Sequence, residues 1–111
     1  MRLSEAEASR AGFEPQVTTL PAGHLPCAVV PHRTAGAITL VSESGTDRLL
    51  GAHLVLPNAG DVIGEAAMAI RFGLTERDLI STLHPYLRRG EELKLAAQTF
   101  TKDVGKLSCC A

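Results

Sequence analysis

Gly36-Ala37-Ile38-Thr39-Leu40-Val41 and Arg48-Leu49-Leu50-Gly51-Ala52-His53-Leu54-Val55-Leu56 are two runs with the composition of β-strands. The residues between them, Ser42-Glu43-Ser44-Gly45-Thr46-Asp47, are of the types that favour tight turns. Two strands joined by a short turn pair antiparallel as a hairpin. The sequence therefore predicts a fold with a small antiparallel sheet that includes this hairpin.

The segment after the hairpin predicts a helix over Asp61–Phe72. Pro57-Asn58-Ala59-Gly60 ends the second strand, and apolar residues then recur at helical spacing, namely Val62, Ile63, Ala66, Ala67 and Ile70. Gly73 ends this helix. Small residues along it, such as Gly64, would let another backbone approach closely.

Shorter elements flank this central part. Ser4–Ala11 and a helix capped by Thr75 both begin with a capping box, in which Ser or Thr is followed three residues later by Glu or Asp. Gln16–Leu20 is rich in Val and Thr and predicts a strand, and Glu91–Phe100 predicts a further helix. This order predicts an α+β domain, with a small antiparallel sheet of three to four strands and helices packed on one face.

Composition excludes several classes of function. The chain has 111 residues, 45% of them hydrophobic, which suits one folded domain. Its net charge is −1, from 11 basic and 12 acidic residues that are mixed along the chain, so neither nucleic acid nor a membrane is expected as a partner. The first residues do not form a signal peptide, and an odd count of 3 cysteines fits a reducing compartment. We therefore expect a cytoplasmic protein.

A proline-rich loop follows the first strand and holds His24, Cys27 and His32. We interpret Cys27 as a small buried hydrophobic residue, which is the usual state of a free cysteine. The two histidines lie eight residues apart, without carboxylates at metal-site spacing. We therefore expect neither histidine to be a metal ligand.

The other two cysteines, Cys109 and Cys110, are adjacent and one residue from the end of the sequence. A disulfide between neighbours would strain the peptide between them and close almost no loop. We expect residues 1–103 to form the domain and residues 104–111 to form a flexible tail that carries this pair. Two accessible thiols on a mobile tether can hold a soft metal ion from both sides. The alternative is a fortuitous exposed pair in a disordered tail.

Part of the sequence resembles a known family. Residues 48–55 and 60–71 are similar to the C-terminal dimerisation domain of the FAD- and pyridine-nucleotide-dependent disulfide oxidoreductases, and His84-Pro85 is similar to the His-Pro motif of that family. The closing run, from Tyr86 through Ala96-Ala97-Gln98-Thr99-Phe100 to Leu107-Ser108-Cys109-Cys110-Ala111, resembles the mercuric reductases within it. The resemblance covers nearly the whole chain.

The resemblance implies a homodimer whose active sites lie at the subunit interface. In the mercuric reductases, a C-terminal cysteine pair captures Hg(II) and passes it to redox-active cysteines of the partner subunit. There FAD, reduced by NADPH, converts it to Hg(0). Cys109 and Cys110 match the transfer pair, and Tyr86 matches a tyrosine that lines the mercuric site. The resemblance thus assigns Hg(II) to Cys109 and Cys110, and a place in the catalytic site to Tyr86 and His84.

The sequence departs from the family pattern at two points. His84 stands where the mercuric reductases carry a bulky apolar residue, and the acidic residue that orients such a histidine in related enzymes is replaced by Arg89. We interpret His84 as lining the site without an essential proton role. The chain also lacks a Gly-x-Gly-x-x-Gly fingerprint and a Cys-x-x-x-x-Cys redox pair. By itself it is therefore expected to bind neither FAD nor NADPH and to have no redox activity.

Three interpretations remain open. The chain is the dimerisation and Hg(II)-capture domain of a mercury(II) reductase whose FAD and NADPH domains lie upstream, or it is a stand-alone homodimeric protein that binds Hg(II) or another soft ion. The third interpretation is a purely structural dimerisation domain with an idle tail. All three predict a homodimer. We expect its interface on the small-residue face of the Asp61–Phe72 helix and on the Glu91–Phe100 segment.

Overall fold

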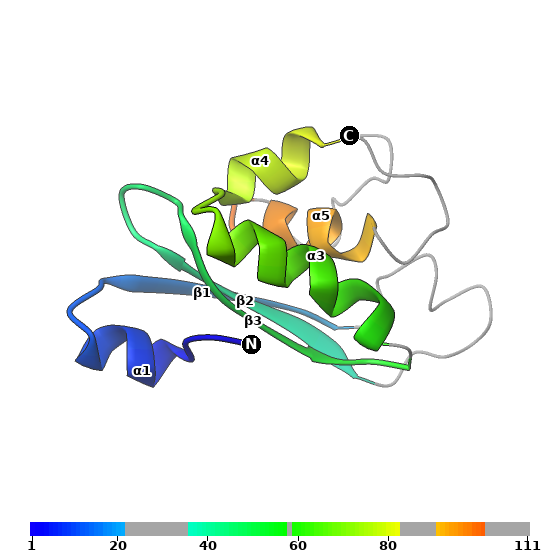
Figure 1. Ribbon diagram of the computed structural model, residues 1–111, viewed down its shortest axis with the longest axis horizontal. Coiled ribbons are helices and arrows are strands. Elements are labelled where there is room, and N and C mark those ends of the chain that lie inside the picture. The colour runs from blue at the N-terminus through cyan, green and yellow to red at the C-terminus, as the bar shows by residue number, and fades with distance from the viewer. Residues whose placement is uncertain (22–35, 58, 83–90, 102–111) are drawn as a thin grey trace.

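The computed structural model describes residues 1–21, 36–57, 59–82 and 91–101 (Figure 1). A three-stranded sheet is the centre of the fold, with strand order β1-β2-β3 and antiparallel pairing throughout. The elements in chain order are α1 (Glu5–Arg10), β1 (Pro15–Pro21), β2 (Ala37–Glu43), β3 (Leu49–Val55), α3 (Gly60–Arg71), α4 (Glu76–Ser81) and α5 (Glu91–Gln98). The predicted α+β class and antiparallel sheet are confirmed.

Strand β2 extends further than the sequence predicts. Ser42 and Glu43 were expected in the turn, but both belong to the strand, beyond an irregularity in the register between Val41 and Ser42. Ser42 is fully buried, and its hydroxyl donates a hydrogen bond to Glu76 on α4. This contact with a residue distant in sequence explains why Ser42, a residue type that favours turns, belongs to the strand here.

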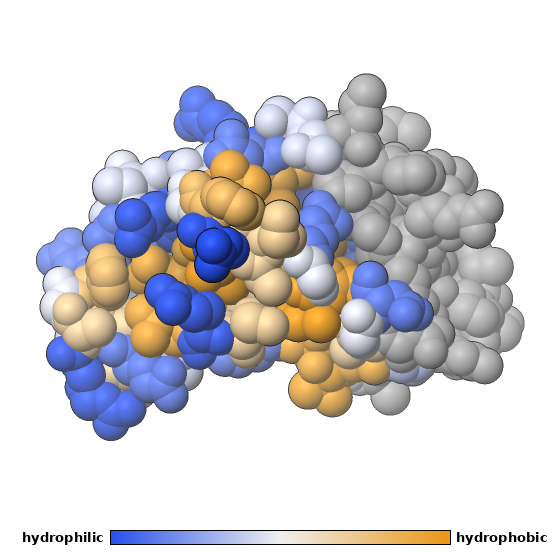
Figure 2. Space-filling model, in the orientation of Figure 1, coloured by the Kyte–Doolittle hydropathy of each residue, from blue (hydrophilic) through white to orange (hydrophobic). Residues whose placement is uncertain are grey.

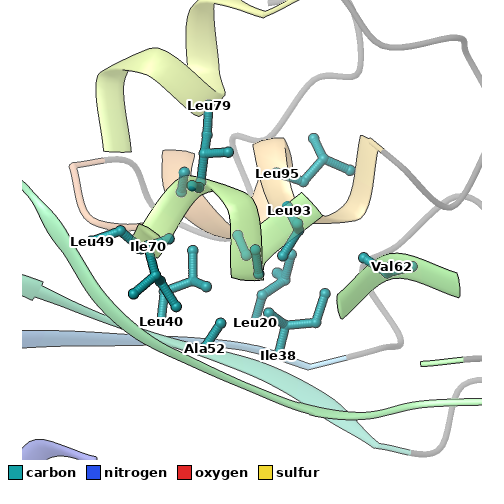
Figure 3. Packing of buried hydrophobic residues seen from close by; sticks show 14 residues of the cluster. Leu20, Ile38, Leu40, Leu49, Ala52, Val62, Ile70, Leu79, Leu93 and Leu95 are labelled. Carbon is teal, nitrogen blue, oxygen red and sulfur yellow. The ribbon is translucent and has the colours of Figure 1, made fainter. Parts of the chain in front are cut away.

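The main core lies between the sheet and α3, α4 and α5, which cover one of its faces (Figures 1 and 3). Leucine and isoleucine side chains from the strands meet leucines from the helices; the labelled members are Leu20, Ile38, Leu40, Leu49, Ala52, Val62, Ile70, Leu79, Leu93 and Leu95. Leu93, Leu95, Ala96 and Ala97 of α5 are buried in this core, so these side chains do not face a second subunit as expected. For the rest of Glu91–Phe100 the expected interface stays a prediction.

Helix α1 covers the opposite face of the sheet (Figure 1). Ala8 packs there with Val41 and Leu50, and Leu3 and Phe13 lie against this second cluster. This departs from the prediction that helices pack on one face. The adjacent pair Leu49-Leu50 explains the difference: neighbouring strand residues point to opposite faces, so both faces of the sheet are apolar and both need cover.

The first three residues run beside β3. The amide of Ala52 donates to the carbonyl of Met1 at 3.1 Å, and the amide of Leu3 donates to the carbonyl of Leu50 at 3.2 Å. Gly51 permits this approach, because a Cβ atom at that position would lie 1.9 Å from the carbonyl oxygen of Leu3. The segment thus covers part of the outer edge of β3, where unpaired main-chain groups would otherwise remain.

Local helix signals are confirmed. Ser4 and Glu7 form a capping box at α1, and Thr75 and Asp78 form one at α4. Gly73 follows α3 with a φ of 67°, in the left-handed region that glycine adopts readily. Helix α3 and its neighbours are short, and none of the described helices has the length and apolar character needed to cross a bilayer.

Candidate functional site

The predicted site residues fall in segments outside the described residues. These segments are 22–35, 83–90 and 102–111, and they hold His24, Cys27, His32, His84, Tyr86, Arg89, Cys109 and Cys110. Their roles stay predictions. Among the described residues, no three His, Cys, Asp or Glu side chains gather closely enough to hold a metal ion. The described elements nevertheless fix the chain on both sides of the segment that carries His84 and Tyr86.

Helices α4 and α5 flank that segment. Helix α4 ends at Ser81 and α5 begins at Glu91, and the two helices contact each other. Leu79 of α4 and Leu93 of α5 are both buried in the main core. Because both side chains are held by close packing in the core, α4 and α5 have fixed positions relative to the sheet on either side of residues 83–90.

A buried polar cluster anchors the first residue of α4. Glu76 is only 6% exposed, and one of its carboxylate oxygens accepts hydrogen bonds from Ser42 Oγ at 3.1 Å and from Gln16 Nε2 at 3.4 Å. Gln16 Nε2 also donates to Asp47 Oδ1 at 3.1 Å, and the amide of Glu76 donates to the carbonyl of Asp47 at 2.9 Å. The cluster joins β1, β2, the hairpin turn and α4.

Burial affects the protonation of Glu76 in this cluster. It raises the pKa of the Glu76 carboxyl, because a charged group is poorly solvated there. The hydrogen bond from Ser42 and the charge of Arg77 oppose the rise in the pKa, whereas the nearby charge of Asp47 adds to it. The sequence pattern does not reveal this cluster, since its side-chain hydrogen bonds join residues that are 31 to 60 positions apart. We interpret it as a structural anchor rather than a ligand site.

Helix α3 has two different sides. Ala66 and Ala69 are buried against the sheet, so these small residues close the core of the chain itself. On the other side, Met68 is 56% exposed and Phe72, just after the helix, is 63% exposed. Gly64 lies on the exposed side, where an added Cβ atom would meet nothing within 4 Å. Of the four small residues expected on a contact face, Ala66 and Ala69 are thus buried in the chain itself, whereas Gly64 is exposed and Ala67 is partly exposed. Contact of this face with a second subunit stays a prediction.

We call the exposed residues Asp61, Gly64, Met68, Arg71 and Phe72 the outer face of α3. Figure 2 shows hydrophobic surface on the side of the molecule where α3 lies, interrupted by hydrophilic residues. The guanidinium carbon of Arg71 lies 5.6 Å from the centre of the Phe72 ring, a distance typical of a cation–π contact. The outer face is thus a mixed apolar and charged surface.

A shallow hollow adjoins this face. It has a volume of about 300 Å³ and is lined by Met1, Arg2, Ala67, Ile70 and Arg71. The hollow lies between the N-terminal segment and α3. Its lining combines apolar side chains with the cationic side chains of Arg2 and Arg71.

The described residues form no dinucleotide-binding unit of the usual kind. FAD and NADPH are held in such enzymes where a strand of a parallel sheet passes through a glycine-rich turn into a helix. Here the sheet is antiparallel, and the described glycine turns, such as those at Gly12 and Gly45, serve a helix end and a hairpin.

Comparison with known proteins defines the class. Residues 3–97 match the family described as pyridine nucleotide-disulphide oxidoreductase, dimerisation domain, and the chain belongs to this family. Among similar proteins of known function are mercuric reductases. The chain is 50% identical to that of Staphylococcus aureus over 109 residues, covering 98% of this chain and 20% of that protein. It is 51% identical to that of Streptomyces lividans over 109 residues, covering 98% and 23%.

Solved structures agree with this placement. The disulfide reductase RclA from Escherichia coli superposes with a TM-score of 0.82 at 27% identity, covering 91% of this chain and 23% of that one. LpdA from Mycobacterium tuberculosis gives a TM-score of 0.81 at 19% identity, covering 92% and 22%, and supports the fold alone. The chain thus spans about a fifth of the length of the curated relatives that it matches.

Proposed function

We propose that the chain is the dimerisation and Hg(II)-capture domain of a mercury(II) reductase. The observation that carries the proposal is the identity of about half over 98% of the chain to mercuric reductases, within a family of dimerisation domains. In this role, Cys109 and Cys110 take up Hg(II) and pass it to the redox site of a partner subunit. The reduction itself belongs to domains outside these 111 residues.

The chemistry of the tail suits this role. Thiolates are soft ligands, and Hg(II) is a soft ion that prefers them to oxygen or nitrogen. A cysteine pair can release the ion by exchanging one sulfur ligand at a time with another thiol, so the ion never has to enter water. Each exchange requires a thiolate and an accessible sulfur. The proposed role therefore requires that the sulfur atoms of Cys109 and Cys110 are accessible.

The fold supplies an anchor for the tail. Helix α5 is fixed by Leu93 and Leu95, which are buried in the main core, and it ends at Gln98. Residues 102–111 follow, and ten residues of extended chain span at most about 36 Å. In this proposal the tail brings Cys109 and Cys110 to a site on a neighbouring subunit while α5 stays in place.

The partner in this proposal is a second copy of the chain. The description of the family as a dimerisation domain supports it, as does the outer face of α3, which exposes Met68 and Phe72. Exposed apolar groups of this size on a small domain are typical of interaction surfaces. The dimer is also what would bring one tail to the site of the other subunit.

A chimeric enzyme tests the proposal. The matching part of the Staphylococcus aureus mercuric reductase would be replaced by this chain, and Hg(II)-dependent NADPH oxidation measured with thiol-bound Hg(II). We expect the chimera to be active and the Cys109→Ala/Cys110→Ala variant to lose roughly tenfold or more of its kcat/KM. The Cys27→Ala variant serves as the control and should retain activity. An unchanged rate in the double variant would contradict a role for the tail.

A further inference from the structure

The residues after α5 are wound into a tight turn on the end of that helix. The amides of residues 99–101 each donate to the carbonyl three positions earlier, at 3.1, 3.3 and 3.2 Å in chain order. Such bonds satisfy carbonyl groups that the last turn of a helix leaves without an intrahelical partner. Residues 102–111, which include Cys109 and Cys110, follow directly in the sequence. The position of this turn therefore decides where the chain that carries the cysteine pair starts.

A side-chain hydrogen bond attaches this turn to β1, an outer strand of the sheet. Thr18 Oγ1 on β1 and Thr99 Oγ1 are hydrogen-bonded across 81 positions of sequence. Thr99 Oγ1 also donates to the carbonyl of Ala96 at 2.6 Å. A hydroxyl group has a single hydrogen, so Thr99 cannot donate to Thr18 as well, and Thr18 is the donor of the bond between them. The two hydroxyl groups thus link β1 to the last turn of α5.

The alternation of β1 places Thr18 on the side of the strand that the helices cover. Successive strand residues point to opposite faces, so Gln16, Thr18 and Leu20 share a face. On this face Leu20 is fully buried in the main core, and Gln16 donates to Glu76 on α4. Helix α5 lies against β1 and β2. Strand β1 therefore holds both α4 and α5, the helices on either side of residues 83–90.

We infer that Thr18 is a positioning residue for Hg(II) transfer by the tail. Its hydroxyl holds the turn after α5 on β1, so the chain that carries Cys109 and Cys110 leaves the domain at a fixed place. A tethered group meets its target more often when the anchor of the tether is fixed at a suitable distance from that target. The inference rests on the proposed function, because Thr18 has this role only if the tail carries Hg(II).

The hydrogen bond itself limits the size of the effect. Folding exchanges hydrogen bonds with water for those within the protein, so the net contribution of one such bond corresponds to roughly a two- to tenfold change in an equilibrium constant. Without the Thr18 hydroxyl, Thr99 still donates to the carbonyl of Ala96, so this donor keeps its partner. Removing the hydroxyl of Thr18 should therefore loosen the turn while the domain stays folded.

Thr19 provides a matched control on the opposite side of β1. Its hydroxyl is hydrogen-bonded at 3.0 Å to that of Thr39, the residue opposite it on β2, and this pair is exposed. Thr18→Val and Thr19→Val therefore make the same chemical change. Each removes one hydrogen bond between two threonines and keeps a side chain branched at Cβ, which suits a strand. Of these two bonds, the one made by Thr18 involves the turn after α5.

Hydrogen exchange of the full chain, followed by NMR, tests the attachment directly. In Thr18→Val, the amides of Phe100 and Thr101 should exchange roughly two- to tenfold faster, because the turn opens more often. Thr19→Val should leave both rates unchanged. Thr18→Ser keeps the hydroxyl and should keep the slower exchange. Equal rates at these amides in the two valine variants would overturn the attachment and with it the inference.

The chimeric mercuric reductase that carries this chain tests the role in transfer. With thiol-bound Hg(II), Thr18→Val should lower kcat/KM roughly two- to tenfold, whereas Thr18→Ser and Thr19→Val should retain the original value. In the Cys109→Ala/Cys110→Ala background, Thr18→Val should have no further effect, because no cysteine pair remains to be positioned. A loss that persists undiminished in that background would overturn the inference, since it would reflect a general destabilisation of the fold.

The inference and the proposed function can fail separately. If the Cys109→Ala/Cys110→Ala chimera keeps full activity, both Hg(II) capture by the tail and the role of Thr18 are overturned. If that chimera loses activity but Thr18→Val behaves like Thr19→Val, the role of Thr18 is overturned and Hg(II) capture by the tail stands.

Discussion

The hydroxyl of Ser42, the penultimate residue of β2, donates a hydrogen bond to the carboxylate of Glu76, at the start of α4, over 3.1 Å. Both residues are buried, and the contact crosses 34 positions of sequence. It ties α4, which leads into the segment of His84 and Tyr86, to the central strand of the sheet. Changes to either partner therefore test how firmly that helix is held.

Replacing Ser42 by alanine removes a donor from a buried carboxylate. We expect the free energy of unfolding to fall by about 1–3 kcal/mol, since the acceptor is left without that partner in a site of low solvation. Urea denaturation monitored by circular dichroism measures the change. Ser44→Ala, in the exposed part of the hairpin turn, is the matched control and should change stability by no more than about 0.5 kcal/mol. Equal effects at the two serines would contradict the anchor.

Glu76 should make stability depend on pH. Its pKa is raised in the folded chain by burial, so the folded state holds this proton more tightly than the unfolded state. The resulting stabilisation is fully present below the ordinary carboxyl pKa and is lost as pH rises through the raised pKa. Glu76→Gln cannot titrate, so the stability of the unchanged chain should fall relative to this variant as pH rises above the ordinary carboxyl pKa of 4.5. A difference between the two that stays constant with pH would contradict the raised pKa.

The close approach of the N-terminal segment to β3 depends on Gly51. Gly51→Ala would place a methyl group on the carbonyl of Leu3, and we expect a loss of about 1–3 kcal/mol and faster hydrogen exchange at the Ala52 amide. Gly64→Ala is the control, because its methyl group meets nothing and helix propensity should stabilise the chain by up to about 1 kcal/mol. Unaltered exchange at Ala52 in the Gly51 variant would show that the segment is not held there.

Truncating a buried apolar side chain should cost far more stability than truncating an exposed one. Leu93→Ala opens a cavity under α5 and should lower the free energy of unfolding by about 2–5 kcal/mol. Phe72→Ala removes a side chain that is 63% exposed and should change the stability of the monomer by less than about 1 kcal/mol. Chemical denaturation at low protein concentration measures both. A large loss of monomer stability for Phe72→Ala would place that ring inside the fold.

Local signals in the sequence predicted much of the fold. The capping boxes at Ser4 and Thr75 marked two helix starts, and the turn residues between two apolar runs marked the hairpin, because both signals act over a few neighbouring residues. The position of α1 was missed, since only packing reveals which face of a sheet a short helix covers. Ser42 was placed in the turn because its partner, Glu76, lies far away in sequence.

For the candidate site, the sequence predicted the family, but the roles of individual residues are not tested. The resemblance to disulfide oxidoreductases is confirmed by the family match over residues 3–97. The roles of His84, Tyr86, Cys109 and Cys110 came from that resemblance and stay predictions. The outer face of α3 could not be separated from its buried face by composition alone, because Gly64, Ala66 and Ala69 are all small and only the fold shows which of them face solvent.

The most direct test of the central claim is Hg(II) binding to the reduced chain in competition with a small dithiol. We predict that the unchanged chain and Cys27→Ala each bind a single Hg(II) ion per chain. The Cys109→Ala/Cys110→Ala variant should lose affinity by roughly a hundredfold or more, equivalent to about 2.7 kcal/mol. Equal affinity of the double variant and the unchanged chain would contradict Hg(II) capture by the tail and leave a dimerisation domain whose metal chemistry lies elsewhere.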